Sequence, residues 1–255
     1  CEQPARLPEM KSPGFVTSTA STLVTRLLIM GVTSLTGVVA ARALGPADLG
    51  AFTVALALPM LFSLFLQFGV GIANVYYMGQ RRYPAEVLLG NALTLSLITS
   101  GVALPIYLAL IPLLSRTVAA GIPPLALAIV GLSIPAALVG GHLSYIFLGL
   151  HDVQEYNWLR LIRNGGTLLL LMVFILLFDL RVIGALLAVN VAWLAMVARG
   201  FWALRGRVKV RLAWDWDVLS ECLKLGVKGY LANLFQFFNY RLDVLLQPLT
   251  RELLP

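Results

Sequence analysis

The stretch RALGPADLGAF, residues 42–52, lies between two long apolar runs and holds a cation, a Gly-Pro pair and an anion. Each of these features suits a tight joint between two helices. Arg42 is typical of a helix C-terminus, and Gly45 of a left-handed cap. Pro46 suits a first helical position and Asp48 a first helical turn. The stretch therefore predicts a helical hairpin, and the runs that flank it decide the fold.

The composition of the chain is that of an integral membrane protein. Of its 255 residues, 59% are hydrophobic and 12% are charged, against about 25% charged residues in an ordinary soluble domain. The mean hydropathy is +0.87. The net charge of +7 comes largely from connecting loops, where membrane topology already demands Lys and Arg. A nucleic acid is therefore not an expected partner, whereas membrane lipids are.

Apolar runs long enough for the ~20 residues that a helix needs to cross a bilayer recur along the whole chain. They cover residues 16–41, 51–71, 87–114, 124–149, 156–178, 182–204 and 227–249. The runs lack the alternation of a membrane barrel, and lipid offers no partner for an open backbone. We therefore expect an all-α, polytopic membrane protein, with a six-helix N-terminal bundle and a seventh transmembrane helix of an incomplete second bundle.

Basic residues are distributed unequally between the two sets of loops. Arg81 and Arg82 follow the second run, and residues 205–211 hold four more basic side chains after the sixth. The loops of the other set hold one arginine each: Arg42, Arg116 and Arg181. By the positive-inside rule, the N-terminus is predicted to be cytoplasmic in a bacterial inner membrane.

A change of texture after residue 204 divides the chain. Residues 205–226 hold basic side chains, then Trp214 and Trp216, then a short amphipathic turn that Asp215 or Asp217 would cap. This segment is interpreted as a cytoplasmic linker with an interfacial helix, and an aromatic belt beside a solvated loop is the alternative. The predicted organisation is a cytoplasmic tail, a six-helix lobe, the linker and the first helix of a truncated C-terminal lobe, at residues 1–15, 16–204, 205–226 and 227–255.

Three motifs carry a resemblance to a known family. They are R-A-L-G-P-x-x-L-G-x-F at 42–52, FGVGIANVYYMGQRR at 68–82, and LKLGVKGYLANLFQFFNYRLDVLLQ at 223–247. Together they resemble the polysaccharide or lipid-linked-oligosaccharide flippase branch of the multidrug/oligosaccharidyl-lipid/polysaccharide exporter superfamily. The resemblance implies two six-helix bundles around a cavity that opens alternately to each side. It also implies that a C-terminal lobe of the same protein is missing here; a natural half-transporter is the alternative.

An arginine inside the first apolar run points to the substrate class. Arg26 lies about ten residues into that run, or ~15 Å at 1.5 Å per residue, near the bilayer centre. A charge there costs at least ~2.5 kcal/mol unless it has a partner or a wet cavity. Thr22, Thr33 and Gly37 share its stripe of the helix. We expect Arg26 to line a cavity and contact an anion, and a structural tie to a neighbouring helix is the alternative.

Other polar groups in the runs are candidates for the same cavity. Arg163 precedes a Gly165-Gly166 weak point, and substrate contact and a structural role are equally consistent with its depth. Arg241 and Asp243 stand at i and i+2, so they do not face each other and each needs another partner. The predicted substrate-binding residues are Arg26, Arg163, Arg241, Asp243, Thr22, Thr33 and Asn91.

Three function classes compete for this pattern. A lipid-linked glycan flippase needs fixed cations to hold a phosphate or pyrophosphate head group, which suits the arginine fork. A cation-coupled multidrug antiporter, the second candidate, would place carboxylates in its first lobe, and the interiors of the first six runs hold none. An enzyme would need an activated nucleophile, a catalytic acid or a metal set, and His142 stands alone. We therefore expect a transporter that flips an anionic lipid-linked glycan precursor, without catalytic residues, cofactor or metal.

Overall fold

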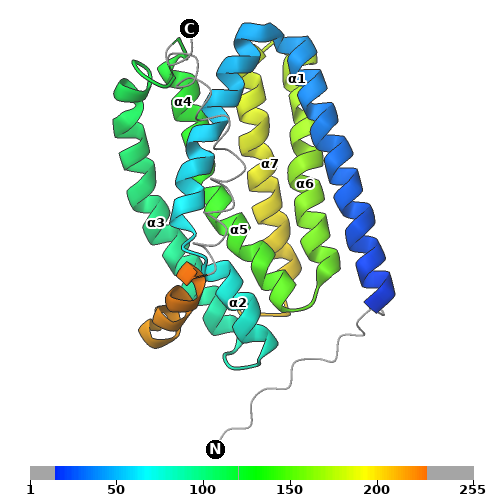
Figure 1. Ribbon diagram of the computed structural model, residues 1–255, viewed down its shortest axis with the longest axis vertical. Coiled ribbons are helices and arrows are strands. Elements are labelled where there is room, and N and C mark those ends of the chain that lie inside the picture. The colour runs from blue at the N-terminus through cyan, green and yellow to red at the C-terminus, as the bar shows by residue number, and fades with distance from the viewer. Residues whose placement is uncertain (1–14, 120, 229–255) are drawn as a thin grey trace, which may run out of the picture.

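The computed structural model describes residues 15–119 and 121–228 as a bundle of long helices (Figure 1). Within these residues no strand is present, and the prediction of an all-α polytopic protein is confirmed. The helices are α1 (Phe15–Leu66), α2 (Val70–Gly79), α3 (Ala85–Leu114), α4 (Pro124–Gly131), α5 (Ser133–Gly149), α6 (Val153–Met172), the π-helical η1 (Val173–Leu177) and α7 (Arg181–Leu204). Residues 216–228 form a further helix.

Five helical segments of the described chain are long and apolar enough to cross a membrane. The first of them, Ser21–Leu66, covers most of the first two predicted runs, because α1 is two helices joined at a kink. The next four correspond to the third to sixth runs. The seventh predicted run, at 227–249, lies almost entirely outside the described residues.

The hairpin predicted from residues 42–52 is present at the kink of α1. Gly45 has φ 77° and ψ 173°, a conformation open essentially only to glycine. It therefore has the predicted positive φ without the ψ of a left-handed cap. The two arms of α1 fold back on each other at this point (Figure 1). The anion of the stretch, Asp48, lies 3.7 Å from the Arg181 guanidinium at the start of α7, so it ties the hairpin to a neighbouring helix.

The predicted span at 124–149 is divided into α4 and α5 near Leu132. Side chains donate to backbone carbonyls of the turn that precedes the break. The Asn190 Nδ2 group of α7 donates to the Ile129 carbonyl at 3.0 Å, and the Ser133 hydroxyl donates to the Val130 carbonyl at 2.6 Å. Such pairing is what permits an irregular backbone at membrane depth.

The weak point predicted at Gly165-Gly166 is wrong, because α6 runs without interruption from Val153 to Met172. The irregular turn lies further along, in the π-helical segment Val173–Leu177. Gly166 packs against Ala192 of α7, whose Cβ lies 3.6 Å from an ideal Cβ position on the glycine. Gly166 thus packs α6 against α7, whereas nothing lies within 4 Å of an ideal Cβ at Gly165.

Residues 205–228, which we call the strap, lie against α2 and the N-terminal part of α3. The Asn91 side chain holds the strap by two bonds: its Nδ2 donates to the Asp215 carbonyl at 3.2 Å, and its Oδ1 accepts from the Asp215 amide at 2.8 Å. The Asp215 carboxylate in turn accepts from the Val218 amide at 3.2 Å. The predicted helix cap is therefore confirmed at Asp215.

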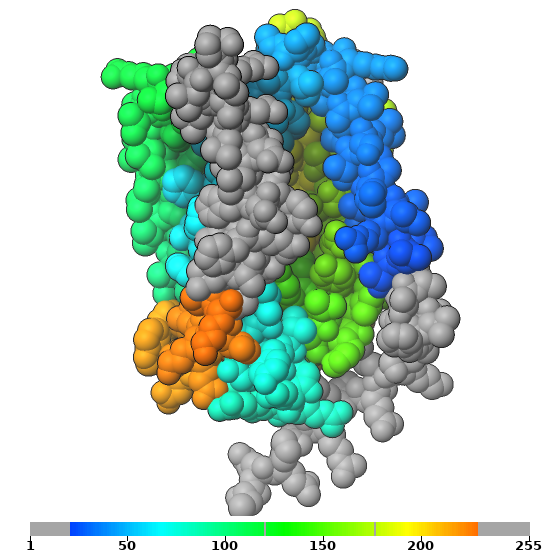
Figure 2. Space-filling view, in the orientation of Figure 1, coloured from blue at the N-terminus to red at the C-terminus, as the bar shows by residue number. Residues whose placement is uncertain are grey.

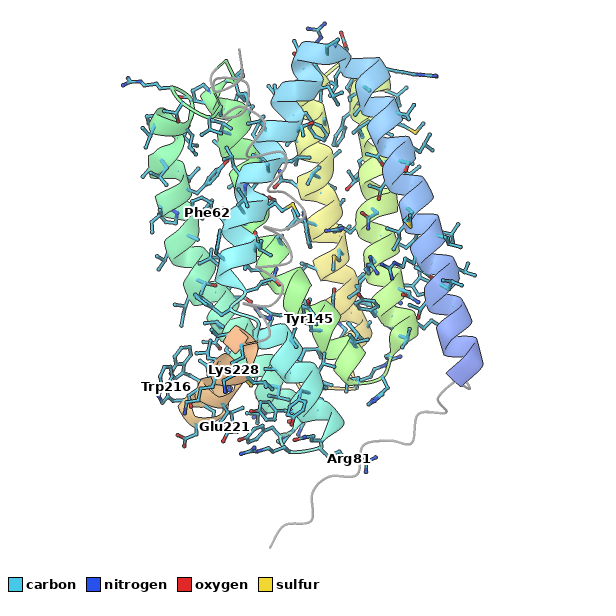
Figure 3. The ribbon with its side chains drawn as sticks, viewed as in Figure 1. Phe62, Arg81, Tyr145, Trp216, Glu221 and Lys228 are labelled. Carbon is cyan, nitrogen blue, oxygen red and sulfur yellow. The ribbon has the colours of Figure 1, made fainter. Side chains whose placement is uncertain are left out.

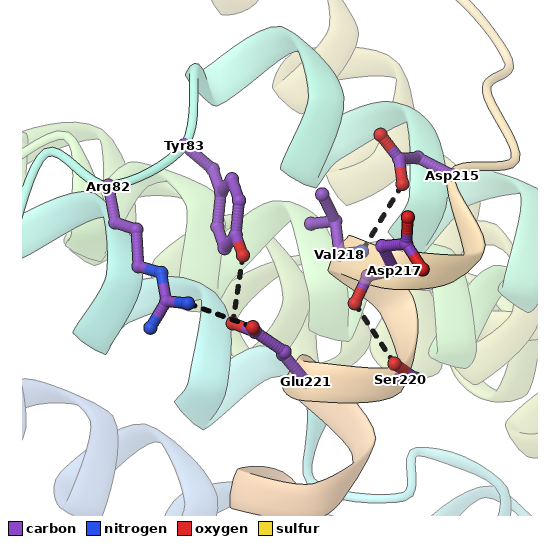
Figure 4. Close-up of polar contacts among 7 residues, drawn as sticks. All are labelled: Arg82, Tyr83, Asp215, Asp217, Val218, Ser220 and Glu221. Atoms are coloured by element: carbon purple, nitrogen blue, oxygen red, sulfur yellow. Dashed lines mark hydrogen bonds and ion pairs between the residues drawn. The ribbon is translucent and has the colours of Figure 1, made fainter.

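A second set of contacts holds the helical part of the strap (Figure 4). The Glu221 carboxylate accepts from the Arg82 guanidinium and from the Tyr83 hydroxyl, each at 2.8 Å. The hydrogen bond to Glu221, followed by partial desolvation, raises the pKa of Tyr83. This cluster joins the α2–α3 loop to the strap helix.

The end of the strap helix touches the joint between α1 and α2. Phe68 and Gly69 have positive φ values of 47° and 69° in this joint. A Cβ added at Gly69 would overlap the Gly226 carbonyl oxygen, and one added at Gly226 would lie 2.7 Å from the Gly69 carbonyl carbon. The two backbones are therefore in direct contact, which only glycine at both positions allows.

The strap also buries a thiol whose reactivity reports its docking. Cys222 is 2% exposed, and burial, then the charge of Glu221, raises its pKa to about 11. Because the thiolate is the reactive form, maleimide labelling of Cys222 at pH 7 should be at least ~100-fold slower than that of an ordinary exposed thiol. The measurement is the labelling rate of full-length protein with Cys1→Ser.

Releasing the strap should reverse this protection. Asn91→Ala combined with Glu221→Ala removes both sets of strap contacts, so labelling of Cys222 should accelerate. Glu86→Ala, which removes an exposed carboxylate from the first turn of α3, is the matched control and should leave the rate unchanged. Rapid labelling of Cys222 without the strap substitutions would contradict the docked arrangement.

Candidate substrate groove

A groove of about 290 Å³ lies between the two arms of α1 and the helices α6 and α7. In the space-filling view, parts of α6 and α7 are recessed behind the first arm of α1 (Figure 2). The first arm contributes Thr33, Thr36, Gly37 and Ala40, and the second arm Leu49, Phe52, Thr53 and Leu56. The helices α6 and α7 contribute Arg163, Asn164, Thr167, Val189 and Trp193.

Arg163 is the one charged residue among the described residues that line the groove. Its guanidinium carbon lies 4.8 Å from the centroid of the Trp193 ring, within the range of a cation–π contact. One terminal nitrogen, Nη2, donates to the Asn164 Oδ1 atom at 3.2 Å. Arg163 is thus held from two sides, and donors of its fork remain for a ligand.

The neighbours of Arg163 are themselves fixed. The Asn164 Nδ2 group donates to the Arg160 carbonyl at 2.7 Å, and the Thr167 hydroxyl donates to the Arg163 carbonyl at 2.7 Å. Trp193 packs on Gly140 of α5, where an added Cβ would lie 3.2 Å from the Trp193 ring. The cation and its aromatic support are therefore preorganised by three helices, α5, α6 and α7.

Three of the four threonine hydroxyls that line the groove, those of Thr36, Thr53 and Thr167, already donate to backbone carbonyls. Thr36 donates to the Val32 carbonyl at 2.7 Å and Thr53 to the Leu49 carbonyl at 2.8 Å. Since each hydroxyl has one proton, these groups offer only acceptor lone pairs to the groove. Arg163 is left as the strong donor.

Two carboxylates at the start of α6 are each paired with an arginine. Glu155 lies 2.6 Å from Arg199, and Asp152 lies 2.6 Å from Arg207. Arg199 also stacks on Trp202, with 4.5 Å between the guanidinium carbon and the ring centroid. Within the described part of the chain, no carboxylate lines the groove and no group of His, Cys, Asp and Glu is placed to hold a metal ion.

The predicted site residues are distributed over different environments. Arg163 and Thr33 line the groove. Arg26 is exposed on α1, on the same stripe as Thr33 but two turns nearer the N-terminus, and Thr22 is half-buried one turn further back. Neither lines the groove.

Asn91 does not line the groove either, because it is 2% exposed and its amide holds the strap. Arg241 and Asp243 lie outside the described residues. Among the groove residues absent from the predicted set, Thr167 stands one turn from Arg163, a spacing visible in the sequence. Trp193 comes from a separate helix, and no local pattern marks it as the partner of Arg163.

Several solved structures have the same fold as this chain. A MATE structure in the straight conformation has a TM-score of 0.72 at 19% identity, and the match covers 91% of this chain and 56% of that chain. An outward-facing multidrug resistance MATE family transporter of the MOP superfamily has a TM-score of 0.71 at 18% identity, and the match covers 86% of this chain and 52% of that chain. A MOP superfamily transporter from Pyrococcus furiosus has a TM-score of 0.69 at 20% identity, and the match covers 86% of this chain and 52% of that chain. That transporter is described as having a binding pocket of reversed polarity, which suggests a different function.

These likenesses establish the fold, and the chain spans about half the length of the solved structures that it matches. No curated protein sequence matches the chain significantly. A family model described as polysaccharide biosynthesis protein matches residues 15–246, which is most of the chain. The sequence match and the fold together place this chain in the polysaccharide biosynthesis protein family of multi-pass membrane proteins.

Proposed function

We propose that this chain is the first lobe of a transporter that flips a lipid-linked glycan precursor with a phosphate or pyrophosphate head group. The observation that carries the proposal is the groove in which Arg163, fixed on Trp193, is the one charged lining residue among those described. A partly dehydrated guanidinium favours an anion and disfavours a cationic drug. Membership of the polysaccharide biosynthesis family supports a glycan as the cargo.

The size and lining of the groove suit the head group of such a substrate. A volume of about 290 Å³ holds a phosphate or pyrophosphate with part of a sugar, while the lipid tail remains in the bilayer. The threonine oxygens are acceptors that suit sugar hydroxyls. In this scheme a second lobe of the same protein completes the cavity, and the two lobes rock to open it alternately to each side. No covalent chemistry is required of the protein.

A binding experiment tests the proposed substrate class. Purified full-length protein is titrated with a short-chain polyprenyl pyrophosphate and, separately, with tetraphenylphosphonium as a cationic drug, and tryptophan fluorescence is recorded. The pyrophosphate should bind, and Arg163→Gln should weaken that binding by roughly ten- to a hundred-fold. Binding of the cation without the pyrophosphate would instead favour the multidrug antiporter.

We also propose that the N-terminus faces the cytoplasm of a bacterial inner membrane. The α2–α3 loop and the strap, which hold Arg81, Arg82 and residues 205–211, lie at the same end of the bundle (Figure 1). The hairpin of α1 lies at the opposite end. This separation agrees with the positive-inside rule.

Cysteine reporters measure the orientation directly. A cysteine that replaces Ala47 in the hairpin should be labelled by an impermeant maleimide in intact cells. One that replaces Arg205 at the start of the strap should be labelled only after permeabilisation. Labelling of both positions in intact cells would reject the proposed orientation.

A further inference from the structure

The non-helical part of the strap presents large apolar side chains to the outside. Residues 209–215 form neither helix nor sheet. Large apolar residues alternate in its sequence with Lys209, Arg211, Ala213 and Asp215, and their side chains are exposed by 44%, 63%, 50% and 59% at Val210, Leu212, Trp214 and Trp216. These exposed apolar side chains have no role in the function proposed for the groove.

The positions between these residues hold the strap to the bundle. A Cβ added at Gly90 of α3 would lie 2.7 Å from the Arg211 carbonyl oxygen and 2.8 Å from the Ala213 Cβ. The Asp215 backbone is bonded to Asn91. Because one side of the strap is fixed on α3, its apolar row is fixed in the outward direction.

The outward row lies on the flank of the bundle near its basic end. Trp216 projects from this flank, beside the foot of α3 (Figure 3). The Trp214 and Trp216 rings are stacked, with 6.0 Å between their centroids and 22° between their planes. The row therefore forms a compact aromatic edge adjoining a membrane-spanning helix.

Basic side chains accompany this edge. Arg205, Lys209 and Arg211 are exposed, while Arg207 pairs with Asp152 at 2.6 Å. Tryptophan favours the level of the lipid head groups, and each basic residue near an anionic membrane surface strengthens the attraction about fivefold. The exposed tryptophans and the basic side chains of the strap thus both suit the head-group layer of the bilayer.

We propose that the strap is a docking surface for anionic phospholipid head groups, with Val210, Leu212, Trp214 and Trp216 inserted at the membrane interface and Lys209 and Arg211 contacting lipid phosphates. The proposal does not depend on what the groove binds. The strap is held by α3 before any lipid arrives, so little ordering accompanies binding.

Quenching of tryptophan by brominated lipid tests this assignment. Full-length protein is placed in phosphatidylcholine nanodiscs that contain a small share of brominated phosphatidylglycerol or brominated phosphatidylcholine. The signal of the strap is the quenching that disappears in the Trp214→Phe, Trp216→Phe variant. Brominated phosphatidylglycerol should quench this signal at a much lower mole fraction than brominated phosphatidylcholine.

Charge variants give the decisive comparison. Lys209→Gln with Arg211→Gln should reduce the preference for the anionic lipid by roughly 30-fold, since two charges are removed. Arg42→Gln with Arg116→Gln, two exposed arginines at the other end of the bundle, removes the same charge and should not change it. Equal quenching by both lipids, or a preference unaffected by the strap variant, would overturn the proposal. The proposal would also be overturned if neither lipid quenched Trp214 and Trp216 and crosslinking showed that a second copy of the chain covers them.

Discussion

Replacing Arg163 by Ala in the full-length protein should reduce glycan export by roughly ten- to a hundred-fold while the protein remains in the membrane. The substitution removes a charge-assisted contact of about 1.5 to 3 kcal/mol to the phosphate-type head group. Arg163→Lys keeps the charge but loses the planar fork and the stacking on Trp193, so its activity should fall between those of Arg163 and Ala. The measurement is export per unit of protein in the membrane.

Two other arginines make the interpretation specific. Arg116, exposed in the loop after α3, is the matched control, and Arg116→Ala should leave export unchanged. Arg26 is exposed two turns before Thr33 on the same face of α1, so Arg26→Ala should have a smaller effect than Arg163→Ala. An Arg163→Ala protein of normal abundance and normal export would contradict the substrate role of the groove.

Gly69→Ala should be among the most destabilising single substitutions in the first lobe. The new Cβ would overlap the Gly226 carbonyl oxygen, and the residue would have to keep a φ of 69°. Overpacking costs about 1–3 kcal/mol, and the left-handed conformation adds about 1 kcal/mol. A loss of this size is a large part of an ordinary free energy of unfolding, about 5–15 kcal/mol. The measurement is the thermal transition of the detergent-solubilised full-length protein.

Gly165→Ala is the matched control for this prediction. No atom outside its own helix and neighbours lies within 4 Å of an ideal Cβ at Gly165, and alanine favours a helix interior by about 0.5–1 kcal/mol relative to glycine. Gly165→Ala should therefore preserve or raise the transition temperature. If Gly69→Ala were as stable as the unaltered protein, the direct backbone contact with Gly226 would not exist.

The sequence was sufficient for the helices and the hairpin because the bilayer itself imposes the rule. An apolar run of fixed minimum length has few alternatives to a helix in lipid. Gly45 and Pro46 then mark the joint between two such runs. Run length contains no information on internal breaks, so the joint at 67–69 and the division at Leu132 were not predicted.

The groove was predicted only in part, because its key contact joins separate helices. Arg163 and Thr33 were accessible from depth and helical periodicity, but the support of Arg163 by Trp193 depends on how α6 and α7 pack. An asparagine in an apolar run can either line a hydrophilic cavity or bond to a neighbouring segment. Asn91 was assigned to the cavity, and in the structure its amide binds the strap. The alternation of residues 209–215 was visible in the sequence, and the segment was interpreted as a linker with an interfacial helix, with an aromatic belt as the alternative; in the structure three of the four large apolar residues precede that helix.

The strap has a consequence for the time course of biogenesis. Its bonds connect residues that are 124 positions apart at Asn91 and Asp215 and 148 positions apart at Asn74 and Cys222. At about 5–20 residues per second of synthesis, the ribosome needs roughly 6 to 30 s to supply the second partner of each pair. For that interval the amides on α2 and α3 await their strap partners. Slow translation or early chaperone release in this window is therefore a point at which insertion of the first lobe is vulnerable.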